Sequence, residues 1–141
     1  GDINGLTVFD AYSGTGALSF EAISRGASSA LAIDVDKDAY LCIVENVEKL
    51  GLKDQVMVLR KNVSGWSRNN QHKTFDVVLA DPPYNDIRPN VIERLFGHLT
   101  SGGLLVLSWP GSEPVRDFDG LDVIAAKKYG DAQLVFYRKV Q

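Results

Sequence analysis

Near its start the chain reads Leu6-Thr7-Val8-Phe9-Asp10-Ala11-Tyr12-Ser13-Gly14-Thr15-Gly16, the pattern of a strand that runs into a glycine loop. This stretch begins as an apolar run typical of a buried strand, and the residues from Ala17 to Arg25 have apolar side chains at helical spacing. A strand, a glycine loop and a helix in this order form a nucleotide-type cofactor site. Gly14 and Gly16 let the backbone approach a ligand closely, and the helix offers free N–H groups to a carboxylate or phosphate. We assign the loop residues Tyr12 and Ser13 to the same site.

The acid at the head of the loop narrows the choice of cofactor. A dinucleotide site would have a third glycine three residues after Gly16, where this chain has Ser19. Asp10 would also place a negative charge near a pyrophosphate. Its carboxylate suits a cation, such as the amino group of a methionine moiety. The loop therefore predicts S-adenosyl-L-methionine as the cofactor.

The end of the second apolar run supplies a candidate ribose ligand. Residues Ser29–Ile33 are apolar, and Asp34 follows them near the spacing of about 20 residues at which an acid binds ribose hydroxyls. We therefore assign Asp34 to the cofactor. Asp36 is the rival candidate, but its place at the start of the next helix gives it a sufficient structural role as the N-cap.

A third strand end adds two more candidates. The strand-like run from Gln55 to Arg60 leads into Lys61, Asn62 and Val63. Asn62 has two interpretations, as a ligand of the adenine amino group or as the cap of the following helix. We assign Asn62 and Val63 to the cofactor site on the first interpretation.

The motif Asp81-Pro82-Pro83-Tyr84 ends another apolar run, Phe75–Ala80. The prolines lack backbone donors and fix their φ angles, so the carbonyls of Asp81 and Pro82 and the Asp81 carboxylate can gather as acceptors. Tyr84 offers a ring face to a planar group. Acceptors on both N–H bonds make a conjugated amino group more nucleophilic, so we assign Asp81, Pro82 and Tyr84 to catalysis by an amino methyltransferase, with Asp81 also bordering the cofactor. The other interpretation is an ordinary turn that ends a strand.

Strands and helices alternate along most of the chain, which predicts a parallel sheet with helices on both faces. We expect strands near 6–11, 29–34, 55–61, 75–81 and 103–109, and helices near 15–26, 37–51, 63–69 and 88–100. The runs 120–127 and 133–138 are too close for a crossover helix and should form an antiparallel hairpin. The three motifs all fall at carboxyl ends of strands, where open α/β sheets bind ligands.

Composition agrees with one cofactor-binding core domain over residues 1–141. The chain is 45% hydrophobic and 23% charged, and it has no apolar run of about 18 residues. No signal-peptide pattern is present, so we expect a cytoplasmic protein. We expect the single cysteine, Cys42, to be a small core residue on the inward face of a helix. His72 and His98 lack partners at ligand spacing, and we predict no metal.

With these motifs in hand, the chain resembles the class I S-adenosylmethionine-dependent methyltransferases. It is most similar to bacterial 16S ribosomal RNA guanine-N2 methyltransferases of the RsmD type. The resemblance covers nearly the whole chain and rests on the following segments: Val8–Leu18, Ser24–Gly26, Asp81–Tyr84, Gly102–Val106, Tyr129–Asp131 and Phe136–Arg138. It implies an α/β, Rossmann-like, seven-stranded sheet in the order 3-2-1-4-5-7-6 with the last strand antiparallel. It also implies a cofactor held by the glycine loop and Asp34, and a target base held at Asp81–Tyr84.

Two features depart from that family. The family has an N-terminal arm ahead of the first strand, and we expect this chain to lack the arm and with it part of the RNA-binding and cofactor-covering surface. The segment Ser108-Trp109-Pro110 stands where relatives more often have an acid.

The formal net charge of −3 gives no overall attraction to nucleic acid, so binding must use local patches. A basic rim can form from Arg60, Lys61, Arg68, Lys73, Arg88 and Arg94, although each of these residues also suits a solvated surface.

The leading hypothesis is therefore a monomeric RNA guanine-N2 methyltransferase acting on ribosomal RNA, free or within an assembling small ribosomal subunit. Two alternatives remain open. One is an adenine-N6 or protein glutamine methyltransferase, since the motif at Asp81 suits any planar amino or amide nitrogen. The other is a cofactor-binding core that is inactive without its arm.

Overall fold

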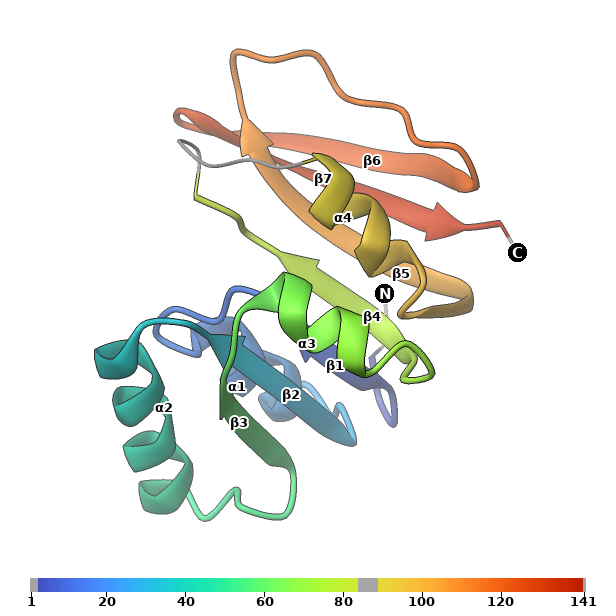
Figure 1. Ribbon diagram of the computed structural model, residues 1–141. Helices are drawn as coiled ribbons and strands as arrows, with labels where there is room; N and C mark the ends of the chain where they lie inside the picture. Colours follow the sequence, from blue (N-terminus) through green and yellow to red (C-terminus); the bar gives the residue numbers. More distant parts are fainter. Residues whose placement is uncertain (1–2, 84–88, 141) are drawn as a thin grey trace.

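The computed structural model describes residues 3–83 and 89–140. In this part of the chain, five strands alternate with four helices, and two more strands follow (Figure 1). The elements are β1 Thr7–Asp10, α1 Ala17–Ser24, β2 Ser29–Asp34, α2 Lys37–Lys49, β3 Val56–Arg60, α3 Val63–Asn69, β4 Phe75–Ala80, α4 Pro89–Phe96, β5 Leu99–Pro110, β6 Leu121–Tyr129 and β7 Ala132–Lys139.

The strands form one sheet in the order β3-β2-β1-β4-β5-β7-β6, which confirms the predicted order. Strands β1 to β5 are parallel, and β7 is antiparallel to both of its neighbours, β5 and β6. The register places Asp10 at the end of β1 opposite Ala32 of β2 and Leu79 of β4. The carboxyl ends of β1, β2 and β4 therefore meet at one edge of the sheet.

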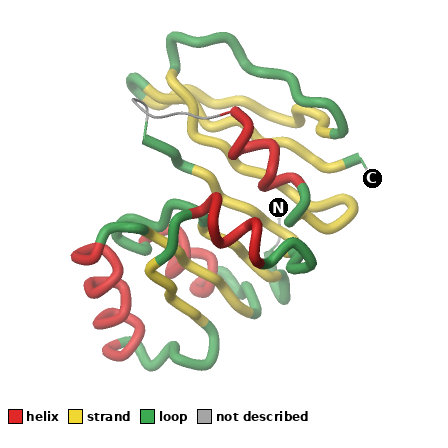
Figure 2. Tube along the Cα trace, viewed as in Figure 1, coloured by secondary structure: helices red, strands yellow, loops and turns green. Residues whose placement is uncertain are grey.

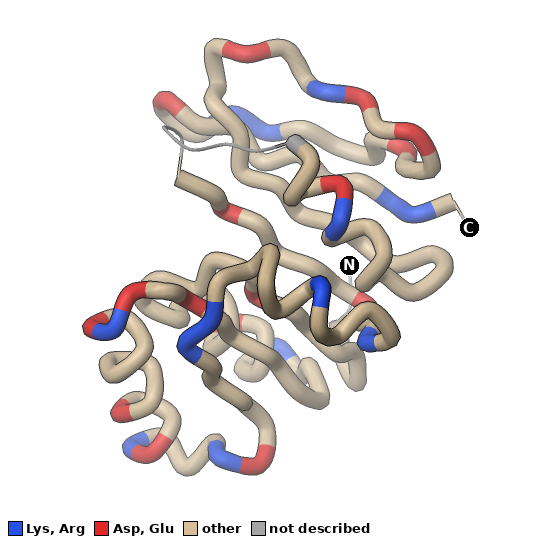
Figure 3. The backbone as a smooth tube through the Cα atoms, in the orientation of Figure 1, with Lys and Arg blue, Asp and Glu red and all other residues tan. Residues whose placement is uncertain are grey.

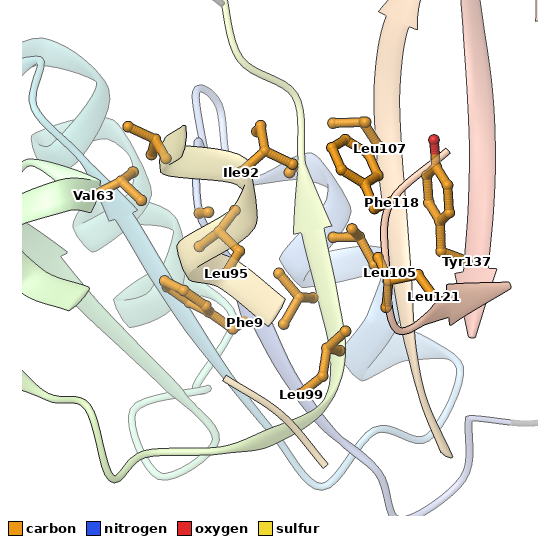
Figure 4. Packing of buried hydrophobic residues seen from close by; sticks show 14 of the residues in the cluster. Phe9, Val63, Ile92, Leu95, Leu99, Leu105, Leu107, Phe118, Leu121 and Tyr137 are labelled. Atoms are coloured by element: carbon orange, nitrogen blue, oxygen red, sulfur yellow. The ribbon is translucent and has the colours of Figure 1, made fainter. Parts of the chain in front are cut away.

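Helices cover the two faces of the sheet in pairs (Figure 2). On one face, α3 and α4 pack through Trp66, Ile92 and Leu95 against a large apolar cluster that includes Phe9 and Leu105 (Figure 4). A second cluster lies on the other face, where α1 and α2 contribute Ala22, Ile43 and Val47. Strands β1, β2 and β4 contribute to both clusters, as their near-continuous apolar sequences require.

A buried histidine fixes α3 against the sheet. His98 is only 2% exposed, and its Nδ1 lies 2.7 Å from the backbone oxygen of Lys73. Because a carbonyl oxygen only accepts, Nδ1 carries a proton and donates. Nε2 lies 2.8 Å from the hydroxyl of Ser67 on α3. The ring of His98 also lies 4.9 Å from that of Trp66, so it joins α3 to the β4 and β5 side of the core.

The boundary predicted between the last helix and the fifth strand is wrong. Helix α4 ends at Phe96 rather than near residue 100, and β5 begins at Leu99 rather than near residue 103. Leu99 pairs with Phe75 and is 2% exposed, so burial in the sheet determines its conformation. A register shift between Phe75 and Val77 separates this first pair from the regular β4–β5 ladder. The early start of β5 therefore does not follow from the regular pattern of the strand.

The expected burial of Cys42 is also wrong, because its thiol is exposed. The residues of α2 that face the core are Ile43 and Val47. Cys42 lies on the exposed side of the helix, where the side-chain amide Nδ2 of Asn46 donates to its sulfur at 3.8 Å.

Within residues 3–83 and 89–140, no helix has both the length and the apolar composition needed to cross a bilayer. In the same residues, no three His, Cys, Asp or Glu side chains gather as metal ligands.

The two loop glycines occupy different surroundings, although both have positive φ angles, 55° for Gly14 and 80° for Gly16. A Cβ atom on Gly14 would meet nothing within 4 Å. A Cβ atom on Gly16 would lie 3.0 Å from Phe20 and 3.1 Å from Ile43. Gly16 therefore packs closely against α1 and α2, and its approach to a ligand stays a prediction.

We therefore expect Gly14→Ala to cost about 1 kcal/mol of stability, the strain of a left-handed alanine. Gly16→Ala should cost about 1–3 kcal/mol more, because the same strain is joined by overpacking. Urea unfolding of the two variants beside the parent measures the difference. Equal losses would show that Gly16 has no special packing role.

Candidate active site

A cleft of about 390 Å³ lies at the carboxyl edge of the sheet. It is bordered by the loop after β1, the ends of β2 and β4, and the start of α3. Its lining residues are Ala11, Tyr12, Gly14, Asp34, Val35, Lys61, Asn62, Val63, Ser64, Asp81, Pro83 and Val91. Tyr12, Gly14, Asp34, Asn62, Val63 and Asp81, which were predicted from separate motifs, thus share one cleft.

Asp34 is held in place by two backbone donors. The N–H of Gly14 donates to its Oδ2 at 2.8 Å, and the N–H of Asp36 donates to its Oδ1 at 2.9 Å. A carboxylate has about four lone-pair sites, so acceptor capacity remains on both oxygens. Asp34 therefore presents a pre-oriented acceptor to the cleft, which is what binding of two adjacent hydroxyls requires.

Asp36 has the structural role that we predicted for it. Its carboxylate accepts a hydrogen bond of 2.9 Å from the N–H of Ala39 and caps α2. Asn62 likewise caps α3, since its side-chain oxygen accepts from the N–H of Gly65 at 3.1 Å. Asn62 also lines the cleft, so the two interpretations of this residue are compatible.

Ser13 ties the loop to the sheet rather than lining the cleft. The hydroxyl oxygen of Ser13 lies 2.7 Å from the backbone oxygen of Ile33 and 3.1 Å from that of Asp10, and both oxygens can accept its proton. Its N–H also donates to the Ile33 oxygen at 3.0 Å. Ser13, Asp10 and Gly16 are the predicted cofactor residues that lie beneath the cleft wall instead of forming it.

Asp10 is a buried carboxyl group under the loop. It is 2% exposed, and the hydroxyl of Ser19 donates to its Oδ2 at 2.8 Å. Burial raises the pKa of Asp10 from its usual 3.8 to about 6, and the negative charges of Asp34 and Asp81 add to the rise while the Ser19 hydrogen bond opposes it. The three carboxylates therefore interact electrostatically, and their combined negative charge favours a cationic ligand in the cleft.

The motif at the end of β4 is described only in part. Asp81 and Pro83 are exposed and line the cleft, whereas Pro82 is buried. Tyr84 lies outside the described residues, and its assignment stays a prediction.

Six lining residues were not assigned to the site from the sequence: Ala11, Val35, Lys61, Ser64, Pro83 and Val91. Val35 is 58% exposed and has no role in the core, but its exposure comes from the fold and could not be read from the sequence. Val91 comes from α4, a distant part of the chain, and only the fold brings it to the cleft.

The lining suits the predicted cofactor. It offers acceptor oxygens from Asp34, Asn62 and Asp81, and Val35, Val63 and Val91 supply apolar surface for a flat ring. A ligand with hydroxyl groups, amino groups and a positive charge fits this chemistry, as S-adenosylmethionine does.

Another hollow, of about 510 Å³, lies over β4, β5, β7 and β6. It contains Asp76, but that carboxylate already accepts from the N–H of Thr7 at 2.9 Å and from the hydroxyl of Thr100 at 3.4 Å. We therefore place the candidate active site at the smaller, carboxyl-edge cleft.

The sheet order is that of the class I methyltransferase fold. A putative methylase from Haemophilus influenzae has the same fold, with a TM-score of 0.89 at 23% identity over 99% of this chain and 89% of that one. A putative methyltransferase from Escherichia coli also has it, with a TM-score of 0.89 at 20% identity over 98% of this chain and 77% of that one. A conserved hypothetical protein from Streptococcus pyogenes superposes with a TM-score of 0.87 at 25% identity, over 96% of this chain and 87% of that one. Residues 1–138 match the family described as "Conserved hypothetical protein 95". The chain belongs to this family.

Two curated relatives are methyltransferases of ribosomal components. Ribosomal RNA small subunit methyltransferase D of Buchnera aphidicola subsp. Acyrthosiphon pisum is 32% identical over 76 residues, which make up 54% of this chain and 39% of that protein. Ribosomal protein L11 methyltransferase of Vibrio cholerae is 32% identical over 133 residues, 89% of this chain and 43% of that protein. The chain thus spans less than half the length of either relative.

The state of Asp10 can be tested through the pH dependence of stability. Its pKa is higher in the folded than in the unfolded chain, so the folded state holds the proton more tightly and ionisation weakens the fold. Stability should fall as the pH rises from about 4 to about 7, by up to about 3 kcal/mol at 1.4 kcal/mol per pKa unit. Asp10→Asn should lack this loss and be the more stable protein at pH 8.

Chemical unfolding at a series of pH values measures this effect. Asp54→Asn, a change of an exposed acid, should reproduce the profile of the parent. An Asp10→Asn profile that falls as steeply as that of the parent would contradict the burial of a titrating Asp10.

Proposed function

We propose that this domain is the cofactor-binding and catalytic core of an S-adenosylmethionine-dependent methyltransferase that methylates the N2 amino group of a guanine in 16S ribosomal RNA. One observation carries the proposal: Asp81 and Pro83 line the same cleft as Gly14, Asp34 and Asn62. A group held at the end of β4 therefore meets a ligand held at the ends of β1 and β2. Membership of the family and the small-subunit relative support ribosomal RNA as the substrate class.

The cofactor half of the cleft uses residues of β1, β2 and α3. Asp34, fixed by the N–H groups of Gly14 and Asp36, accepts from the ribose hydroxyls. Val35 and Val63 offer apolar contact to the adenine ring. The side-chain amide of Asn62 has an acceptor oxygen and an NH2 donor for the polar edge of adenine. Asp10 acts from beneath the loop through its charge, because the side chain does not reach the cleft surface.

The acceptor half uses the end of β4. When bound, the cofactor supplies a methyl group that a sulfonium charge has already activated, so the chain need supply mainly positioning. Asp81 accepts from the guanine amino group and stabilises the positive charge that develops on its nitrogen. Tyr84, from the sequence, supplies the stacking face for the base.

A second candidate is methylation of a ribosomal protein. The L11 methyltransferase of Vibrio cholerae matches 89% of this chain, more than the small-subunit relative does. An acceptor cluster at Asp81 also suits a planar amide. The two candidates differ in substrate and not in the use of the cleft, so one assay separates them.

The assay measures transfer of a tritiated methyl group from the cofactor to 16S ribosomal RNA, small ribosomal subunits and L11 protein in parallel. We expect transfer to the RNA or the subunits. Asp81→Asn should lower kcat about 100-fold with little change in the KM of the cofactor, because it removes an interaction that strengthens in the transition state. Asp34→Asn should instead raise the KM of the cofactor.

Asp54→Asn, which changes an exposed acid outside the cleft, is the matched control and should leave both constants unchanged. Transfer to L11 alone would establish the second candidate. An Asp81→Asn enzyme with the kcat of the parent would remove Asp81 from catalysis.

A further inference from the structure

The acids and bases of this chain are unevenly distributed. Residues 55–75 contain no Asp or Glu, whereas the whole chain has 18 acids. The same stretch contains the basic residues Arg60, Lys61, Arg68 and Lys73. It runs from β3 through α3 to the start of β4 and passes directly along the candidate active site. A chain with a net charge of −3 thus has one locally basic segment beside its cleft.

Helix α4 adds another cation to this segment. Arg68 of α3 and Arg94 of α4 line a hollow of about 400 Å³ between the two helices, together with Ser67, Gln71, Gly97 and His98. We call this hollow the α3–α4 groove. Figure 3 shows Lys and Arg segments in blue on α3 and α4, which lie side by side on the same face of the sheet in Figure 1. Glu93, the acid of α4, is not part of the lining.

The arginine charges of the groove are available to a ligand. Within the described residues, the ion pairs join Arg25 to Glu21, Lys49 to Glu45 and Lys53 to Glu48, and none of them involves Arg68 or Arg94. Both arginines are exposed. Arg94 donates to the hydroxyl of Ser64 at 2.8 Å, a neutral partner that orients the guanidinium without cancelling its charge. Two exposed guanidinium groups without an acidic partner among the described residues, one of them oriented by Ser64, are suited to phosphate.

A hydrogen bond joins the groove to the cleft. Ser64, the partner of Arg94, lines the candidate active site, and so does Lys61 at the other end of the basic segment. A chain of anionic groups that lies across Arg68 and Arg94 would therefore reach the cleft at Ser64 and Lys61. His98, which also lines the groove, holds α3 in place because it joins the hydroxyl of Ser67 to the backbone of Lys73.

We propose that the α3–α4 groove binds the phosphate backbone of the substrate RNA and positions the strand whose target base enters the cleft at Asp81. The proposal rests on the proposed function for the identity of the substrate. Its basis is charge complementarity: RNA carries a negative charge on every nucleotide, and this surface is basic where the rest of the chain is predominantly acidic. A protein substrate would need apolar anchoring residues, and the lining of the groove is polar or charged apart from Gly97.

The test compares two double variants that remove the same charge. Arg68→Gln with Arg94→Gln changes the groove, and Lys49→Gln with Lys53→Gln changes two lysines at the end of α2 and just after it. Fluorescence anisotropy with a labelled fragment of 16S ribosomal RNA gives the affinity at several salt concentrations. The groove variant should bind about 10-fold more weakly, and the slope of log K against log salt should become shallower by about 1.4–2, the contribution of two phosphate contacts.

The lysine variant should keep the affinity of the parent within about twofold. Calorimetry should give both variants the same affinity for S-adenosylhomocysteine as the parent, which shows that the fold and the cleft are intact. Arg68→Lys with Arg94→Lys, which keeps the charge, should restore most of the salt slope. The proposal is overturned if the groove variant binds RNA like the parent, if both glutamine variants lose equally, or if the parent binds no RNA.

The methyl-transfer assay on the same variants separates this proposal from the proposed function. If the parent binds RNA through the two arginines but methylates none of the substrates, the groove stands and the proposed function fails. If the parent methylates RNA and the groove variant does so equally well, the function stands and the groove fails. Loss of binding to L11 protein instead of RNA would also overturn the proposal.

Discussion

Two hydrogen bonds to the carboxylate of Asp34 organise the candidate active site. The donor from Gly14 fixes the loop after β1, and the donor from Asp36 fixes the turn into α2. Ser13 adds three further contacts between the same loop and the backbone, two of them to Ile33 of β2. The parallel sheet brings these strand ends together, but the carboxylate sets the shape of the loop. A single acidic side chain therefore links the cofactor loop to the strand that supplies the proposed ribose contact.

Burial explains why the neighbouring acid behaves differently. Asp10 stands at the end of β1, beneath the loop that Asp34 organises, and its desolvation moves its pKa close to 6. Asp34 and Asp81 remain at the surface of the cleft, where water and ligand can reach them. The acids that line the cleft favour a cationic ligand, whereas the basic segment along α3 would favour an anionic one. The overall charge of −3 averages over this division, which the uneven distribution of acids and bases along the sequence already indicates.

Much of this architecture could be predicted from the sequence because its signals are local. The glycine loop, the acid after β2 and the helix caps at Asp36 and Asn62 each depend on a few adjacent residues. The strand order followed from resemblance, since alternation alone gives a parallel sheet without fixing the order of its strands.

The errors concern features that depend on distant contacts. The start of β5 at Leu99 depends on pairing with Phe75, and the outward position of Cys42 depends on which side of α2 meets the sheet. The packing of Gly16 against Ile43, which no prediction addressed, likewise depends on a distant contact. Val91 lines the cleft only because the fold places α4 beside it.

Binding of the cofactor in the carboxyl-edge cleft can be tested by titrating the ¹⁵N-labelled chain with S-adenosylhomocysteine and recording ¹H–¹⁵N correlation spectra. We expect the largest shifts at the amides of Gly14, Asp34 and Asn62, with little change at Gly102 and Ile124 in the hollow over β5 and β6. Shifts concentrated at Gly102 and Ile124, with the amide signals of Gly14 and Asp34 unmoved, would show that the cofactor does not bind in the carboxyl-edge cleft.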